Sequence, residues 1–189
     1  MYNFEEITQK VKENLSDFRF QHSLRVSEYA QELAKKNNYD IQKAKLAGLV
    51  HDYAKESSNE EFLFYIDKYK LDPELKKWKT PIWHGIVGAY IIKEKLGIED
   101  EDVLHAISVH TTGDIEMTIL DKILYMADWL EPGRDFSETL DAIKTKTEAN
   151  LDYGIAQQLS FALDFLSRKK EAIYPKTLYA YNYWVGGIK

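Results

Sequence analysis

The chain has 189 residues, of which 44% are hydrophobic and 30% charged, and it carries a net charge of −6 without any cysteine. This composition predicts one globular domain with a sizeable core, and it argues against disorder, a broad nucleic-acid surface and a membrane span. The missing cysteines exclude disulfides, thiolate metal sites and a cysteine nucleophile.

The N-terminal stretch shows no basic region followed by an apolar run, so we expect no signal peptide and a cytoplasmic location. Apolar residues then recur at helical spacing, and no run alternates as a half-buried strand does. Spacing and capping residues predict helices over 4–14, 20–36, 41–55 and 60–69, a short helix opened by Asp72-Pro73, and helices over 80–96, 100–110, 118–130, 138–149 and 152–173.

The helices are followed by a tail rich in tyrosine and tryptophan, which reads LYAYNYWVGGIK. We expect this tail to pack against the helices, because aromatic stripes usually bury area, although stacking on a base or a subunit contact stays open. The whole chain is therefore predicted to be one all-α domain over 1–189, with a functional core at about 18–136 and a C-terminal helical extension at about 151–189.

Six polar side chains stand out because they interrupt apolar helices or helix ends. Each alone is typical of a buried residue with one hydrogen bond. Together they form the imidazole and carboxylate set that binds divalent first-row metals without sulfur. The set comprises His22, His51, Asp52, His84, His110 and Asp128. His105 is left out because it lies about 140° around a helix from His110.

The doublet His51-Asp52 is the centre of this hypothesis. An aspartate has two oxygens and can bridge two ions, an arrangement that two-metal sites use in phosphoryl transfer. Lys55 follows one helical turn later on the same side, where it can meet phosphate charge, and Arg25 has the same relation to His22. For Lys55 alone, a solvated cation at a helix end is the plainer interpretation.

The ordered set of histidines and aspartates resembles the HD-domain superfamily of metal-dependent phosphohydrolases. Longer motifs resemble the bacterial YqeK family within it. These motifs are HSLRV at 22–26, AGLVHDYAK at 47–55, HGIVGA at 84–89, HTTG at 110–113, LDKI at 120–123 and ADWLEPGRDF at 127–136. The resemblance implies an HD-domain helical bundle.

The YqeK resemblance also implies symmetrical hydrolysis of diadenosine tetraphosphate to two ADP at a two-metal centre, with iron as the first choice of ion and manganese as the second. Carried over by position, one ion is surrounded by His22, His51, Asp52 and Asp128, and Asp52 bridges to an ion held by His84 and His110. A metal-bound water is expected to supply the attacking hydroxide.

Substrate contacts follow from the same motifs. Asp52, Lys55 and Arg134 are expected to be catalytic, with both cations stabilising charge on the transferring oxygens. The expected substrate-binding residues are His22, Arg25, Lys55, His84, His110, Thr111, Thr112, Gly113, Arg134 and Asp135. For the threonines and Gly113 the plainer alternative is a helix end, and for Arg134 and Asp135 it is an exposed ion pair.

Three alternatives stay open. The chain can be an HD-type nucleotidase or triphosphohydrolase acting on mononucleotides, a metal-dependent nucleotide-binding regulator without turnover, or a helical scaffold with ordinary core histidines. The expected partners are the dinucleotide substrate and its ADP product, without nucleic acid or membrane, and a homodimer is left open.

Overall fold

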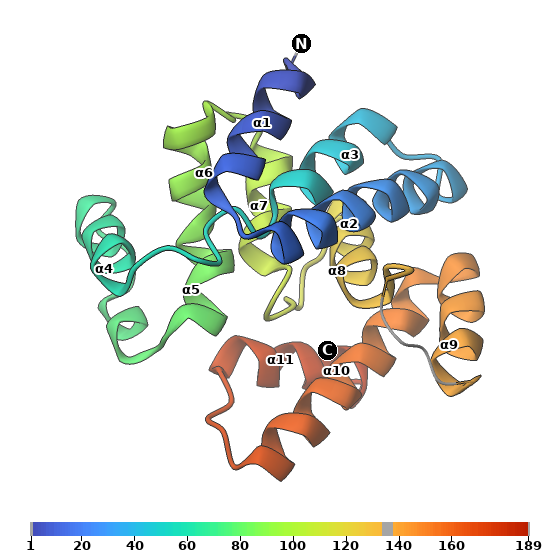
Figure 1. Cartoon of the computed structure of the whole chain (residues 1–189). Coiled ribbons are helices and arrows are strands. Elements are labelled where there is room, and N and C mark those ends of the chain that lie inside the picture. The colour runs from blue at the N-terminus through green and yellow to red at the C-terminus, as the bar shows by residue number, and fades with distance from the viewer. Residues whose placement is uncertain (1, 134–137, 189) are drawn as a thin grey trace.

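Figure 1 shows the arrangement of the helices in the computed structural model, which describes residues 2–133 and 138–188 and, within them, contains helices and no strand. The elements in chain order are α1 (Phe4–Asn14), α2 (Asp17–Lys36), α3 (Ile41–Val50), α4 (Asn59–Lys68), the 3₁₀ helix η1 (Pro73–Lys77), α5 (Thr80–Ile86), α6 (Gly88–Leu96), α7 (Glu101–Val109), α8 (Ile119–Leu130), α9 (Glu138–Ala149), α10 (Leu151–Lys169) and α11 (Pro175–Trp184). The predicted all-α class is confirmed.

Short polar side chains begin several of these helices. Asp40 accepts hydrogen bonds from the first free amides of α3, and Asp100 does the same for α7. Thr118 and Asp121 form a reciprocal capping box at the start of α8. Because these caps satisfy amides that have no partner within the helix, they fix where each helix begins.

The centre of the bundle is formed by α2, α3, α7 and α8. Helix α2 packs along α3 and α8, and α7 packs along α8. The approach of α2 to α3 is especially close at Gly48, where an added Cβ would lie 2.7 Å from the Cα of Ser27. This contact holds α2 and the end of α3 together, and each carries residues of the predicted metal site.

Three predicted helices are shorter or broken in the structure. The helix expected over 41–55 ends at Val50, and residues 51–56 form turns. The helix expected over 80–96 is interrupted at Val87, which separates α5 from α6 but keeps helical backbone angles of φ −82° and ψ −31°. The helix expected over 152–173 ends at Lys169, where Lys170 turns into the left-handed conformation with φ +56°. The first correction matters for function, because it places His51 and Asp52 just beyond a helix rather than inside one.

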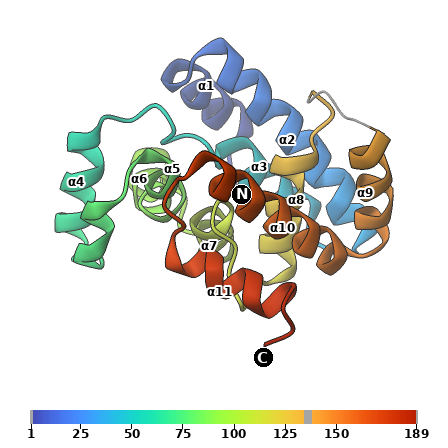
Figure 2. The ribbon, with the colours of Figure 1, turned by 90° about the horizontal axis from the view of Figure 1, so that it is seen from below.

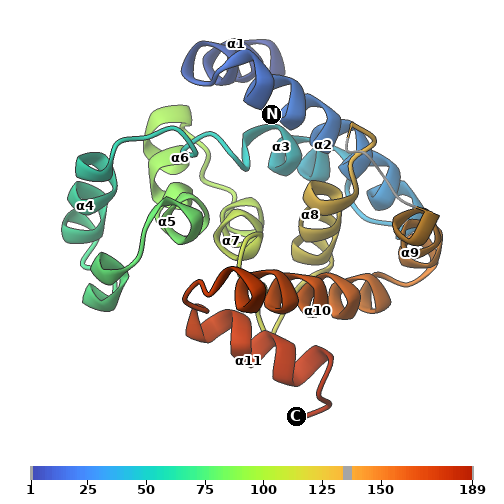
Figure 3. The same cartoon turned by 60° about the horizontal axis from the view of Figure 1, so that its bottom comes forward.

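The C-terminal helices cover one end of the bundle. Helix α10 packs against α8 and α9, and α11 packs against α10. Figures 2 and 3 show α10 crossing near α7 and α8, with α11 on its outer side. The aromatic tail is therefore mostly helical, and Trp184 Nε1 donates a hydrogen bond of 2.7 Å to the carbonyl of Asp114. Its packing against the bundle agrees with the prediction. Among the helices of the described residues, none is both long and apolar enough to cross a bilayer.

Candidate metal centre

The six residues predicted to bind metal come together from five parts of the chain. His22 lies on α2, His84 on α5 and Asp128 on α8. His51 and Asp52 follow the end of α3, and His110 follows the end of α7. All are buried except Asp128, whose side chain is 26% exposed. The site therefore lies inside the bundle, and Asp128 is the most exposed of its six candidate ligands.

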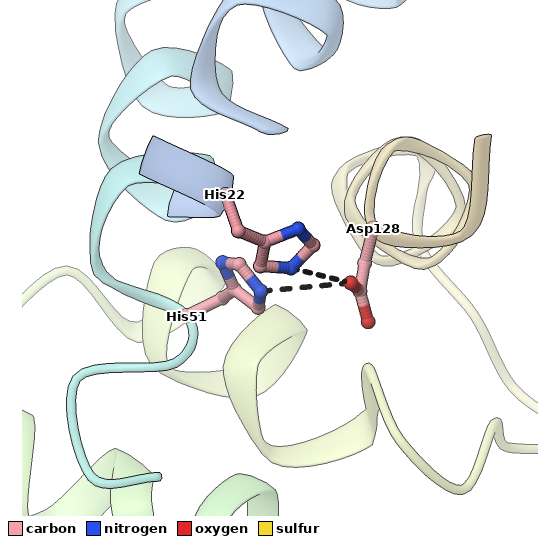
Figure 4. A group of neighbouring side chains, drawn as sticks. All are labelled: His22, His51 and Asp128. Atoms are coloured by element: carbon pink, nitrogen blue, oxygen red, sulfur yellow. Dashed lines mark ion pairs between the residues drawn. The ribbon is translucent and has the colours of Figure 1, made fainter. Parts of the chain in front are cut away.

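Figure 4 shows three of these side chains pointing toward one another. Oδ1 of Asp128 lies 3.0 Å from Nε2 of His22 and 3.7 Å from Nε2 of His51. The two imidazole rings face each other edge to face, with centroids 5.3 Å apart. Two nitrogens and one oxygen thus converge on a small volume, and the ligand atoms of all three lie within 4.8 Å of one another.

Asp52 connects this group to the remaining histidines. Its Oδ2 faces Nε2 of His51 at 3.8 Å and of His22 at 4.0 Å. Its Oδ1 faces Nε2 of His84 at 3.4 Å and of His110 at 3.8 Å. The two oxygens of one carboxylate therefore face different pairs of histidines, which is the arrangement that a bridge between two ions requires.

Three of the histidines are oriented by the main chain. The Nδ1 atoms of His51, His84 and His110 lie 2.8, 2.8 and 2.6 Å from the carbonyl oxygens of Gly48, Thr80 and Ile107. A carbonyl can only accept a hydrogen bond, so Nδ1 of each ring is the protonated nitrogen. Nε2 of each ring then carries the lone pair and is the atom that can bind a cation.

The buried polar atoms of this cluster fit a metal site. Within the described residues, Nε2 of His51 and Oδ1 of Asp52 are buried and have no hydrogen-bond partner. Such atoms are costly in a protein interior unless something binds them. Burial alone would raise the pKa of Asp52, but the charges of His51 and the other surrounding groups hold it well below its usual value. The carboxylate is thus ionised and ready to bind cations.

Lys55 lies beside the second pair of histidines. Its Nζ is 2.7 Å from Nε2 of His84 and 3.5 Å from Oδ1 of Asp52. Burial, together with the positive charge of Lys55, lowers the pKa of His84 to about 3. His84 is therefore a neutral imidazole across the physiological range, as metal binding requires.

The other residues predicted to contact the substrate differ in whether they reach the site. Thr111 Oγ1 reaches into the site, 3.1 Å from Nε2 of His84. Thr112 is fully buried and its hydroxyl donates to the carbonyl of Gly113, so the structure does not direct it toward a ligand. Gly113 adopts φ +66° and packs toward α10 and α11. Arg134 and Asp135 lie outside the described residues.

Arg25 pairs with an acidic side chain of the protein. Its Nε donates a 2.7 Å hydrogen bond to Oε2 of Glu131, which is an ion pair within the protein. A role of Arg25 in binding substrate stays a prediction. His105 lies apart from the site, as expected, because its Nδ1 bonds Asp121 at 3.0 Å.

Two charged residues near the site were not predicted from the sequence. Nη1 of Arg19 lies 3.5 Å from Oδ2 of Asp52, and the Arg19 side chain is 35% exposed. Glu131 is buried beside His22, with Oε1 3.3 Å from Nδ1. Their spacing in the sequence could have pointed to them. Arg19 lies three residues before His22 and Glu131 lies three residues after Asp128, about one helical turn in each case.

Residues 19–133 match the family model described as the HD domain, so the chain belongs to the HD-domain family. It is 36% identical over 185 residues to the symmetrical bis(5'-nucleosyl)-tetraphosphatase of Bacillus subtilis, covering 98% of this chain and 99% of the relative. It is 40% identical over 174 residues to the protein of the same name from Halalkalibacterium halodurans, covering 92% of each.

A crystal structure from Clostridium acetobutylicum, of a protein described as a predicted HD superfamily hydrolase involved in NAD metabolism, superposes with a TM-score of 0.91 at 34% identity and covers 99% of both chains. The resemblance to HD-domain hydrolases is confirmed. Binding of divalent metal by an HD domain agrees with the groups of histidine and aspartate side chains found here.

Proposed function

We propose that this protein is a metal-dependent hydrolase that cleaves diadenosine tetraphosphate symmetrically into two molecules of ADP. Relatives named for this activity align over nearly the whole chain at 36% and 40% identity. The observation that carries the proposal is the placement of Asp52, whose two oxygens face separate pairs of histidines. A carboxylate bridge between two ions is typical of centres that cleave phosphate esters and anhydrides.

In this proposal six residues hold two ions. One ion belongs to His22, His51, Asp52 and Asp128, and the other shares Asp52 and belongs to His84 and His110. The family resemblance makes iron the first choice and manganese the second, and the residues here suit either ion, because both accept imidazole and carboxylate ligands. The bound ions supply Lewis acidity, which makes water a better nucleophile near neutral pH and neutralises charge on phosphoryl oxygens.

The remaining residues position the polyphosphate. Lys55 and Arg19 are the cations beside Asp52, with Nζ 3.5 Å from Oδ1 and Nη1 3.5 Å from Oδ2. Both side chains are partly exposed, so each can turn its charge to a phosphate at the mouth of the site. Thr111 adds a hydroxyl beside His84. These groups stabilise the charge that grows on the transferring oxygens. Arg134 and Asp135 stay predicted contacts of the same substrate.

The reaction adds one water across the central anhydride bond. Water attacks the phosphorus on one side of the oxygen that links the second and third phosphates, and the bond from that phosphorus to the bridging oxygen breaks. The attacked half leaves as ADP with an oxygen from water, and the other half leaves as ADP with the former bridging oxygen. Burial of the histidines and of Asp52 keeps bulk water out of the centre, which strengthens each electrostatic contact there.

The helices beyond the HD domain complete the site's surroundings in this proposal. We propose that residues 1–189 form one domain, since α10 packs on α8 and α11 packs on α10. Gly113, in the turn after His110, packs against side chains of α10 and α11. This contact supports a role of the C-terminal helices in holding the turn that carries Thr111.

Product analysis in ¹⁸O-labelled water tests the function. Protein purified without oxygen and supplied with Fe²⁺ or Mn²⁺ is expected to convert diadenosine tetraphosphate to ADP alone, with label in the β-phosphate of half of the product. ATP plus AMP would contradict the symmetrical cut. Faster turnover of mononucleotides than of diadenosine tetraphosphate would identify the nucleotidase alternative. Tight ADP binding without any turnover would identify the regulator. Asp52→Ala, which removes the bridging carboxylate, serves as the inactive control.

A further inference from the structure

Glu131 is a buried carboxylate next to His22, and it is not one of the six candidate metal ligands. Glu131 is only 1% exposed and occupies the C-cap of α8. The C-terminal end of a helix carries partial negative charge, so it disfavours an acidic side chain, and burial disfavours the charge further. Two effects thus disfavour a negative charge on Glu131, and its hydrogen-bond partners compensate for them.

The partners of Glu131 divide between its two oxygens. Oε2 accepts from Nε of Arg25 at 2.7 Å and from the main-chain amide of Gly133 at 2.5 Å. Oε1 accepts from Nη2 of Arg25 at 3.3 Å and lies 3.3 Å from Nδ1 of His22. Both oxygens of Glu131 thus accept from the permanently charged guanidinium of Arg25, which is the geometry of an ion pair. A carboxylate in such a pair can only accept, so Nδ1 of His22 carries the proton that it shares with Glu131.

This arrangement sets His22 apart from the other candidate ligands. His51, His84 and His110 donate Nδ1–H to main-chain carbonyls three or four residues earlier in the chain. His22 donates instead to a charged side chain from another helix. A carboxylate partner fixes the ring orientation and makes the opposite nitrogen a stronger ligand than a carbonyl partner does. That opposite nitrogen, Nε2, lies 3.0 Å from Oδ1 of Asp128.

We propose that Glu131 is a positioning residue that fixes the tautomer of His22 and strengthens its bond to the adjacent metal ion. The proposal rests on the proposed metal site. Because Glu131 caps the C-terminal end of α8, three residues after Asp128, one helix and its cap supply both a candidate ligand and the group that orients another candidate ligand on α2. Glu131 therefore acts on one ion more than on the other, since the pair His84 and His110 is oriented by the main chain.

The plainer alternative is that Glu131 only forms a structural ion pair with Arg25. Two variants distinguish the roles. Glu131→Gln keeps the size of the side chain but removes its charge from both partners. Arg25→Met removes the ion pair and leaves the carboxylate next to His22. Glu148→Gln is the matched control, because Glu148 bonds Tyr29 and Lys36 in an ion pair that involves none of the candidate ligands.

Binding of Co²⁺ is measured by calorimetry, and the Co²⁺-loaded protein is examined by NMR. In Glu131→Gln, the affinity for one of the two ions is expected to fall about 10–100-fold, and the affinity for the other is expected to stay near its wild-type value. The exchangeable Nδ1–H signal of His22, assigned by its loss in His22→Gln, should shift or vanish in Glu131→Gln, while the signals of the other three histidines persist. Arg25→Met and Glu148→Gln should keep both affinities and all four signals.

Equal affinities in Glu131→Gln and the wild type would overturn the proposal, and so would an equal loss in Arg25→Met. Glu131→Asp gives a second test that keeps the charge next to Arg25. It should weaken the same ion by less than Glu131→Gln does, and unchanged binding would again overturn the proposal. Failure of the wild type to bind Co²⁺ would instead contradict the proposed metal site itself, so the two failures are distinguishable.

Discussion

The ammonium group of Lys55 lies 2.7 Å from Nε2 of His84, the ring nitrogen that faces Oδ1 of Asp52. A cation held at this nitrogen competes with a metal ion for the same lone pair. Lys55 therefore has two opposed effects in the proposed enzyme: it repels an ion bound at His84 and attracts the phosphates of the substrate. The two effects can be separated by experiment.

Lys55→Met should bind the ion at His84 and His110 more tightly than the wild type and yet turn over more slowly. We expect kcat to fall roughly 10²–10³-fold, the typical cost of removing one group that stabilises the transition state. A Mn²⁺ titration and initial rates at saturating metal measure the two quantities. Lys95→Met is the control, because Lys95 pairs with Glu61 on α4. Unchanged kcat would show that Lys55 does not contact the reacting phosphates.

Asp52→Ala should abolish hydrolysis without loss of the helical circular dichroism signal. The variant removes the one carboxylate whose oxygens face both histidine pairs. His105→Ala is the matched control: it should keep normal activity per folded molecule and lose about 1–3 kcal/mol of stability, because the buried Asp121 loses one partner and keeps the amide of Thr118. Loss of activity in His105→Ala with the fold intact would mean that the excluded histidine belongs to the site.

Metal should stabilise the wild-type protein against heat. At a free concentration 100 times its dissociation constant, one ion contributes about 2.7 kcal/mol, which raises Tm by roughly 5–10 °C in a chain of this size. Differential scanning calorimetry with and without Mn²⁺ measures the shift, and a chelator should reverse it. Asp52→Ala should show little or no shift. Equal shifts in both proteins would place the bound ion somewhere other than this centre.

Gly48→Ala should damage the metal site through packing alone. The added Cβ would lie 2.7 Å from Cα and 2.9 Å from N of Ser27, and a backbone cannot move aside as a flexible side chain does. We expect a loss of about 1–3 kcal/mol in the free energy of unfolding. Metal affinity should fall as well, since α2 carries His22 and the end of α3 carries His51.

Urea unfolding and Mn²⁺ titration measure the two effects of Gly48→Ala. Gly97→Asn is the control, since Gly97 adopts φ +66° at a helix end and no atom lies within 4 Å of a Cβ added there. It should cost little and leave metal affinity unchanged. Wild-type metal affinity in Gly48→Ala would show that the spacing of α2 and α3 does not control the site.

Much of the fold follows from local signals in the sequence. The helix that begins at Asp40 and the one that begins at Asp100 were predictable because an aspartate before an apolar periodic run caps a helix. The end of α3 was not. No glycine or proline lies between Val50 and Glu56, so nothing local stops the helix there, and only the packing of the cluster around Asp52 shows why the chain turns.

The site was predictable as a set but not in its supporting contacts. Histidines and aspartates in helices and at helix ends indicated the candidate ligands, and the structure brings all six together. The ion pair of Arg25 with Glu131 joins residues 106 positions apart, and no periodicity can reveal such a partner. The sequence also could not predict where the hydroxyl of Thr112 points. In the structure it donates to the carbonyl of Gly113.

The spread of the ligands along the chain has a consequence for biosynthesis. His22 belongs to the second helix, whereas Asp128, on α8, lies beyond the first two thirds of the 189 residues. Domains generally fold as units while the ribosome is still adding residues. A nascent chain that lacks α8 lacks Asp128, whose Oδ1 lies 3.0 Å from Nε2 of His22 in the finished fold. The proposed metal site therefore has all six of its candidate ligands only after α8 has been synthesised, so it can be completed only late in synthesis or after release.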